Sequence, residues 1–136
     1  MSYKVQGFPT SPKLEFPGYA WDSPRNGKHA ILLDDFMYID KNGRTHTAPA
    51  GFRTDGGTVT GFFHIVGTPY RNYLAAYIIH DYECDIAEAY KKSNHEMYVT
   101  LRRDADDLFM EMLVYLKAGT VKRWLMYRGV RVGARF

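Results

Sequence analysis

The pattern of apolar and polar residues along the chain changes near residue 70. Residues 29–39 (HAILLDDFMYI) are a β-strand candidate, residues 40–43 predict a turn, and a return strand begins over residues 44–48. The turn contains Asn-Gly, which is among the better hairpin signals when apolar runs flank it. Residues 50–57 predict a short extended segment ending in a glycine pair. The Pro- and Gly-punctuated segment up to residue 28 is expected to follow the surface.

Helical periodicity dominates the second half of the chain. We predict helices over residues 70–90, 94–117 and 121–132, with Ala118-Gly119 as a C-cap of the second. The second helix carries one apolar stripe at helical spacing: Leu101, Ala105, Leu108, Phe109, Met112, Leu113 and Leu116. The pattern predicts one α+β domain over residues 1–136. A hairpin and short sheet precede two long helices and one shorter helix.

Composition agrees with a globular protein, since 46% of the residues are hydrophobic and 24% are charged. The formal net charge of +3 is too small to indicate nucleic-acid binding by itself. Cys84 is the single cysteine, so no intramolecular disulfide can form. The first residues lack the apolar core of a signal peptide, and no apolar run reaches the roughly 20 residues needed to cross a bilayer. We therefore expect an intracellular protein without a membrane anchor.

The His80-Asp81 pair is the leading candidate for chemistry. On the predicted helix, Tyr77 and Cys84 share the face of His80, and Asp81 points about a quarter turn away. The preceding residues 74–79 are apolar or aromatic, which predicts a central helix. An imidazole and a carboxylate are costly to bury there without partners. The pair is therefore either a hydrogen-bonded structural feature or part of a functional site.

Asp106 lies at the margin of the apolar stripe on the second helix. If the two helices pack antiparallel, its carboxylate can reach a ring nitrogen of His80 and fix the tautomer of the imidazole. Alternatively, Asp106 pairs with Arg102 or Arg103 along the helix surface, a contact of under about 1 kcal/mol. The residues alone favour this second interpretation.

Thr54, Asp55, Gly56 and Gly57 form a third feature, a carboxylate followed by two glycines. Such a turn lets backbone groups approach an ion closely, and Ca²⁺ prefers carboxylate and carbonyl oxygens. This loop and Asp81 could supply those oxygens together. Most Asp-Gly-Gly segments, however, are ordinary turns.

Other chemical features are weaker. His64 and His95 lack ligand-like spacing with His80, which disfavours a zinc site. Cys84 could act as a nucleophile beside His80, but a small buried filler is the commoner role. The basic C-terminal tail, interleaved with Trp124 and Tyr127, could meet phosphates or an anionic surface, although such helices usually pack their aromatic residues inward.

The order of these motifs resembles a small uncharacterised family that is frequent in tailed bacteriophages and prophages. The matching segments are Ala50-Gly51-Phe52-Arg53-Thr54-Asp55, His80-Asp81, Ala105-Asp106-Asp107-Leu108-Phe109 and residues 124–133. The resemblance spans about residues 29–133. It implies a phage setting, with the protein in the host cytoplasm or in the virion, and it implies no activity.

The same order is more distantly similar to the core of prokaryotic phospholipase A2. That resemblance implies that His80 activates water, Asp106 orients His80, and Asp81 binds Ca²⁺ together with the loop of Asp55, Gly56 and Gly57. The chain departs from this family in having Cys84 where the family has Tyr after His-Asp, and in lacking its disulfides and secretion signal.

Three functions follow as expectations. The first is a calcium-assisted hydrolase of ester or related bonds, with a small-molecule or lipid-like substrate. The second is a non-enzymatic phage protein of the virion or tail, or a host-interaction factor, in which the His-Asp cluster is structural and the partner is a phage or host protein. Contact with nucleic acid through the basic tail is the third and least favoured.

Overall fold

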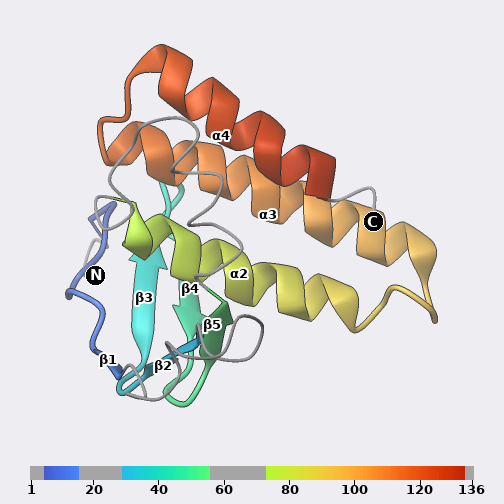
Figure 1. Ribbon diagram of the computed structural model, residues 1–136, viewed down its shortest axis with the longest axis horizontal. Helices are drawn as coiled ribbons and strands as arrows, with labels where there is room; N and C mark the ends of the chain where they lie inside the picture. Colours follow the sequence, from blue (N-terminus) through green and yellow to red (C-terminus); the bar gives the residue numbers. More distant parts are fainter. Residues whose placement is uncertain (1–4, 16–28, 56–72, 134–136) are drawn as a thin grey trace.

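The computed structural model describes residues 5–15, 29–55 and 73–133. Short strands come first and three helices follow, which confirms the predicted α+β class (Figure 1). The strands are β1 (Leu14–Glu15), β2 (His29–Leu32), β3 (Phe36–Ile39), β4 (Thr45–Ala48) and β5 (Arg53–Asp55). The helices are α2 (Leu74–Glu88), α3 (His95–Tyr115) and α4 (Thr120–Gly133).

The strands form two small antiparallel sheets, one of order β1-β2-β5 and one of β3 and β4. The single strand predicted over residues 29–39 is therefore wrong, because the chain leaves the first sheet after β2 and enters the second at β3. The Asp35 carboxylate accepts a hydrogen bond of 2.8 Å from the Ala50 amide at this break. Local apolar character alone did not reveal that tertiary contact.

The segment up to residue 28 follows the surface over its described residues 5–15, as predicted, but it also pairs with the sheets. Its residues 14–15 form β1, which pairs with β2, and Gly7 forms an isolated bridge with Ile39. Residues 16–28 lie outside the described part of the chain.

The predicted hairpin of β3 and β4 is confirmed, with Phe36 opposite Ala48 and Ile39 opposite Thr45. Asp40 shapes its turn, because one carboxylate oxygen accepts hydrogen bonds from the amides of Asn42 at 2.8 Å and Arg44 at 3.0 Å. Gly43 has a φ of 83°, a left-handed conformation that glycine adopts without steric cost. The predicted Asn-Gly turn therefore has a clear local cause.

The helices begin and end close to the predicted positions. Asn94 is the N-cap of α3, where its side chain accepts a hydrogen bond from the Met97 amide at 3.1 Å. The C-cap differs from the predicted Ala118-Gly119. Lys117 takes the left-handed conformation at φ 64°, and the Ala118 amide donates to the Leu113 carbonyl at 3.0 Å. This is a Schellman motif in which Lys117 occupies the position usually held by glycine.

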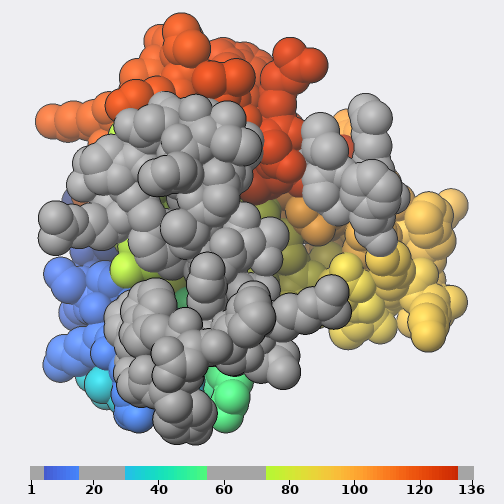
Figure 2. All heavy atoms as spheres, viewed as in Figure 1, coloured from blue at the N-terminus to red at the C-terminus, as the bar shows by residue number. Residues whose placement is uncertain are grey.

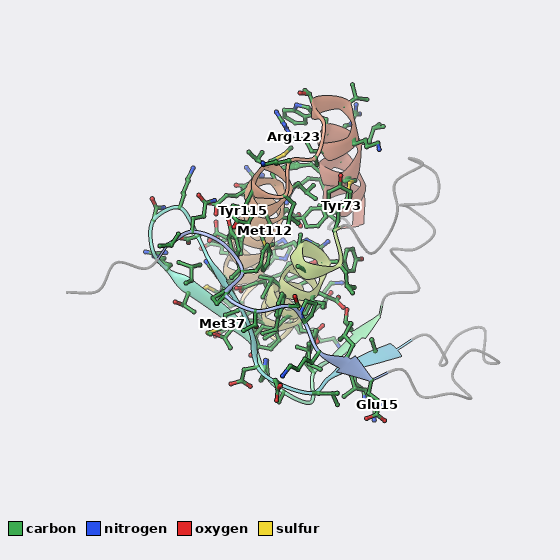
Figure 3. The ribbon with its side chains drawn as sticks, turned by 90° about the vertical axis from the view of Figure 1, so that its left-hand side faces the viewer. Glu15, Met37, Tyr73, Met112, Tyr115 and Arg123 are labelled. Atoms are coloured by element: carbon green, nitrogen blue, oxygen red, sulfur yellow. The ribbon has the colours of Figure 1, made fainter. Side chains whose placement is uncertain are left out.

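Helix α2 is central, because it contacts strands β3, β4 and β5 on one side and α3 on the other. Helix α4 packs on α3, away from the strands (Figures 1 and 3). Figure 3 shows this layering from the side, with Arg123 on α4 at one extreme and Glu15 on β1 at the other. The core cluster takes residues from the strands and all three helices: Leu32, Phe36, Tyr38, Ala48, Tyr73, Ala76, Ile78, Ile79, Phe109, Met112, Leu113, Ala118 and Met126.

Among the described residues, no helix has the length and apolar character that crossing a membrane requires.

Candidate functional site

His80 and Asp106 meet where α2 packs against α3. The His80 Nε2 atom lies 2.6 Å from Asp106 Oδ1, and the two residues are 4% and 0% exposed. The His80 ring also lies against Phe109, with ring centroids 4.8 Å apart. The sequence placed His80 on a central helix and Asp106 at the edge of an apolar stripe. The structure brings the two together, with Asp106 fully buried.

Two arginines complete the surroundings of Asp106. Arg131 on α4 places Nη1 2.8 Å from Oδ2, and Arg102 on α3 places Nε 3.4 Å from Oδ1. Arg102 also donates to the Val130 carbonyl of α4 at 3.0 Å. The alternative pairing with Arg102 therefore exists together with the His80 bond, in the interior instead of on the helix surface. The sequence does not link Arg131 to Asp106, because α4 must pack on α3 before the two meet.

Cys84 and Tyr77 line the same site. Cys84 Sγ lies 3.4 Å from His80 Nε2, and the Tyr77 ring centroid lies 6.2 Å from that of His80. Burial raises the pKa of the Cys84 thiol to about 12, so the group is protonated at neutral pH. This opposes a role as a thiolate nucleophile.

One cluster of described residues has the side-chain types that hold metal ions. The candidate ligand atoms of His80, Cys84 and Asp106 lie within 4.8 Å of one another. A cation there would compete with Arg102 and Arg131 for the single carboxylate, and it would require the Cys84 thiol to lose its proton. The positive charge of the two arginines makes this cluster a poor cation site.

The Thr-Asp and His-Asp motifs lie side by side. The buried Thr54 hydroxyl donates a hydrogen bond of 2.8 Å to Asp81 Oδ2, which links β5 to α2. The backbone of Asp55 pairs with His29 in the sheet. The side chain of Asp55, together with Gly56 and Gly57, lies outside the described part of the structure.

A second histidine cluster was missed by the sequence analysis. His46 on β4 bonds Glu83 of α2 through Nδ1 and Asp40 through Nε2, both at 2.9 Å. The hydrogen bond to Glu83 raises the pKa of His46, more than burial lowers it, and Asp40 adds to the effect. Burial would raise the pKa of Asp40, but the hydrogen bonds from His46 and the turn amides lower it overall. The hairpin register could have indicated the Asp40–His46 contact. The contact of His46 with Glu83 could not be predicted, because it depends on how the hairpin packs against α2.

Comparison with known proteins places most of the chain in one family. Residues 30–130 match the family model described as "Protein of unknown function (DUF1353)". The chain is 32% identical over 79 residues to the uncharacterized protein y4iH of Sinorhizobium fredii (strain NBRC 101917 / NGR234), which covers 57% of the chain and 33% of that protein. It is 35% identical over 69 residues to the uncharacterized protein y4jT of the same strain, covering 49% of the chain and 20% of that protein.

The matched regions thus span about a third and a fifth of these relatives. No solved structure matches the chain significantly. These descriptions name no activity, and they do not bear on the predicted phage setting or on phospholipase A2.

Proposed function

The chain belongs to the DUF1353 family, and for this member we propose a hydrolase of ester or related bonds. In this proposal His80 is the general base and Asp106 orients its ring. The observation that carries it is the 2.6 Å contact between His80 Nε2 and Asp106 Oδ1. A buried imidazole held through one nitrogen by a carboxylate is the arrangement that general-base catalysis uses.

The contact assigns different roles to the two ring nitrogens. Asp106 carries no proton when ionised, so Nε2 donates to it and the neutral ring keeps a lone pair on Nδ1. Nδ1 is then the atom that takes a proton from an attacking water, and Asp106 stabilises the resulting imidazolium. Cys84 and Tyr77 border the ring and limit how a substrate approaches.

The calcium part of the proposal rests on Asp81. Its carboxylate lies beside the segment of Thr54 and Asp55, and these oxygens are of the kind that a hard cation takes. Calcium binds six to eight oxygens, more than Thr54 and Asp81 supply, so the site would also need Asp55 and the carbonyls of Gly56 and Gly57. A bound calcium ion would stabilise negative charge on the substrate oxygen.

Turnover of p-nitrophenyl butyrate and of dispersed phosphatidylglycerol tests the base. We expect His80→Ala to lower kcat/KM by about 10²- to 10⁴-fold, with a cooperative melting transition retained. His95→Ala is the matched control, because His95 is exposed at the start of α3. If wild-type protein turns over neither ester nor lipid, or if His80→Ala keeps full activity, the hydrolase proposal fails.

Calcium is tested separately by the melting temperature. Saturating Ca²⁺ should raise the Tm of the wild type through its preference for the folded state, and Asp81→Asn should abolish that rise. Asp85→Asn, an exposed carboxylate one turn further along α2, is the control. If Ca²⁺ leaves the Tm unchanged, the calcium part of the proposal fails, and the role of His80 as general base is unaffected.

As a second candidate we propose a non-enzymatic phage accessory protein, and one observation supports the non-enzymatic part of it. Asp106 is 0% exposed and joins side chains from all three helices, as a purely architectural cluster would. In that case wild-type protein has no turnover, and His80→Ala lowers stability because it removes one partner of a buried carboxylate. Measuring Tm and turnover on the same variant separates the two candidates.

A further inference from the structure

Helix α4 presents an apolar stripe to solvent. Val121, Trp124 and Leu125 are 73%, 55% and 46% exposed, although large apolar side chains are normally covered. Their spacing, with Arg128 one turn further on, places all four on one helical face. Figure 2 shows α4 at one border of the molecule.

The stripe is not required for packing α4 onto the rest of the protein. The opposite side of the helix does that, with Met126 at 0% exposure in the core cluster. The Tyr127 hydroxyl donates to Asp107 of α3 at 2.7 Å, and Arg131 reaches Asp106. The helix thus has a packed side and a separate outward apolar side.

Positive charge predominates around the stripe. Lys117, Lys122 and Arg128 are exposed on or beside α4, and the sequence contains no Asp or Glu after Glu111. One exposed carboxylate, Asp107 of α3, lies in the groove beside Trp124 and accepts a hydrogen bond from the Tyr127 hydroxyl. A surface that complements this face therefore carries negative charge.

A groove of about 490 Å³ between α3 and α4 adjoins the stripe. Trp124 and Tyr127 line it together with Met110 and Val114, and Arg123 and Asp107 supply its polar groups. Amphipathic rings beside apolar side chains and cations are typical of residues that lie at a membrane–water interface.

From these features we propose that the outward face of α4 binds the surface of an anionic lipid bilayer. The apolar side chains would enter the boundary between headgroups and acyl chains, and the flanking cations would meet the headgroup phosphates. A second copy of the chain fits less well, because pairing two such faces would bring Lys122 and Arg128 near like charges. Phosphate contacts with a nucleic acid would leave Val121 and Leu125 in water. This surface is separate from the His80 site and does not depend on hydrolysis.

Co-sedimentation of the full chain with vesicles tests the proposal. We expect binding to vesicles of phosphatidylcholine mixed equally with phosphatidylglycerol, and at least about tenfold weaker binding to phosphatidylcholine alone. The double variant Trp124→Ala/Leu125→Ser should weaken binding to the mixed vesicles about tenfold or more. Lys122→Glu/Arg128→Glu should weaken it by a similar factor, and rising salt should reduce wild-type binding.

Matched controls lie on α3 and before it. Val99 is 42% exposed, and Arg103 and Lys92 are also exposed. The variants Val99→Ser and Lys92→Glu/Arg103→Glu therefore remove exposed apolar surface and reverse exposed positive charge away from α4. Equal binding to neutral and anionic vesicles, or equal losses in variants and controls, would overturn the proposal. So would a dimer that Trp124→Ala dissociates in light scattering, or binding to duplex DNA with none to vesicles. Circular dichroism checks that each variant is folded.

Discussion

Two histidines in this protein are both held by carboxylates, yet their surroundings differ in charge. His46 uses both ring nitrogens for two carboxylates, Asp40 and Glu83, and among the described residues no arginine guanidinium forms an ion pair with either of them. His80 uses Nε2 for one carboxylate, and that carboxylate also contacts Arg102 and Arg131. The first cluster needs a positive charge from the histidine, whereas the second already contains two.

This difference separates a structural histidine from a candidate base. A ring that donates from both nitrogens must be protonated and has no lone pair left for a substrate. His80 meets a carboxylate through one ring nitrogen only, and the charge of that carboxylate is balanced by the two arginines. In this protein the difference lies in the carboxylates and arginines around each histidine, and the residues adjacent to His46 and His80 in the chain do not show it.

The largest expected loss of stability comes from breaking the His80 cluster. Asp106→Ala should lower the free energy of unfolding by about 3–5 kcal/mol, because Arg102 and Arg131 lose the charge that compensates them in a partly buried site. Urea denaturation followed by circular dichroism measures it. Asp104→Ala, an exposed carboxylate on the same helix, should change stability by less than about 0.5 kcal/mol. Equal effects in the two variants would contradict the buried network.

The corresponding change in the other cluster should cost less. His46→Ala should destabilise the protein by about 1–3 kcal/mol, because it leaves the carboxylates of Asp40 and Glu83 without their shared donor. Asp40 keeps its bonds to the turn amides, which limits the loss. Urea denaturation at neutral pH, with the exposed His95→Ala as control, measures the difference. If His46→Ala lowered the free energy of unfolding as much as Asp106→Ala does, the two arginines would not explain the difference between the clusters.

A pH titration sharpens the comparison further. The folded state raises the pKa of His46 above 6.5, so its stabilisation is complete below pH 6.5 and is lost as pH rises through the folded-state pKa. The wild-type advantage over His46→Gln should therefore shrink above pH 6.5, by up to about 1.5 kcal/mol. Urea denaturation of both proteins between pH 5 and 9 measures it. If the stability difference between wild type and His46→Gln grew with rising pH, it would contradict the raised pKa of His46.

The smallest effect concerns Cys84. Cys84→Ala should lower the free energy of unfolding by about 1 kcal/mol or less and should leave turnover measurable, because a thiol with a pKa of about 12 supplies little thiolate. Esterase assays beside His80→Ala test this. Loss of turnover in Cys84→Ala equal to that in His80→Ala would make the cysteine the nucleophile instead.

Sequence alone could predict the elements that local pattern determines. The apolar stripe of α3 and the N-cap Asn94 set a helix that differs from the predicted one by one or two residues at each end. The hairpin turn followed from Asn42-Gly43 and Asp40. The break after β2 coincides with Asp34 and Asp35, two polar residues that interrupt the apolar pattern and that the single-strand prediction passed over. The Asp35–Ala50 contact at the bend depends on the tertiary fold.

The candidate site divides in the same way. His80 and Asp106 could be proposed as partners because helical geometry puts each on a face that an antiparallel neighbour would meet. The contribution of Arg131 could not, because it depends on how α4 lies across α3. The Glu83–His46 bond likewise depends on the position of the hairpin against α2. Such contacts depend on how one element packs on another, and no local pattern of apolar and polar residues predicts them.

The bond between Tyr38 and Glu111 has a consequence for how the protein comes apart. Tyr38 is 0% exposed and its hydroxyl donates to Glu111 of α3 at 2.5 Å, across 73 positions of sequence. Burial and that bond raise the pKa of the Tyr38 hydroxyl. Local unfolding of the hairpin would expose this ring and leave a carboxylate of α3 without its donor. We therefore expect the hairpin and the helices to unfold together, even though the pattern of apolar and polar residues changes near residue 70.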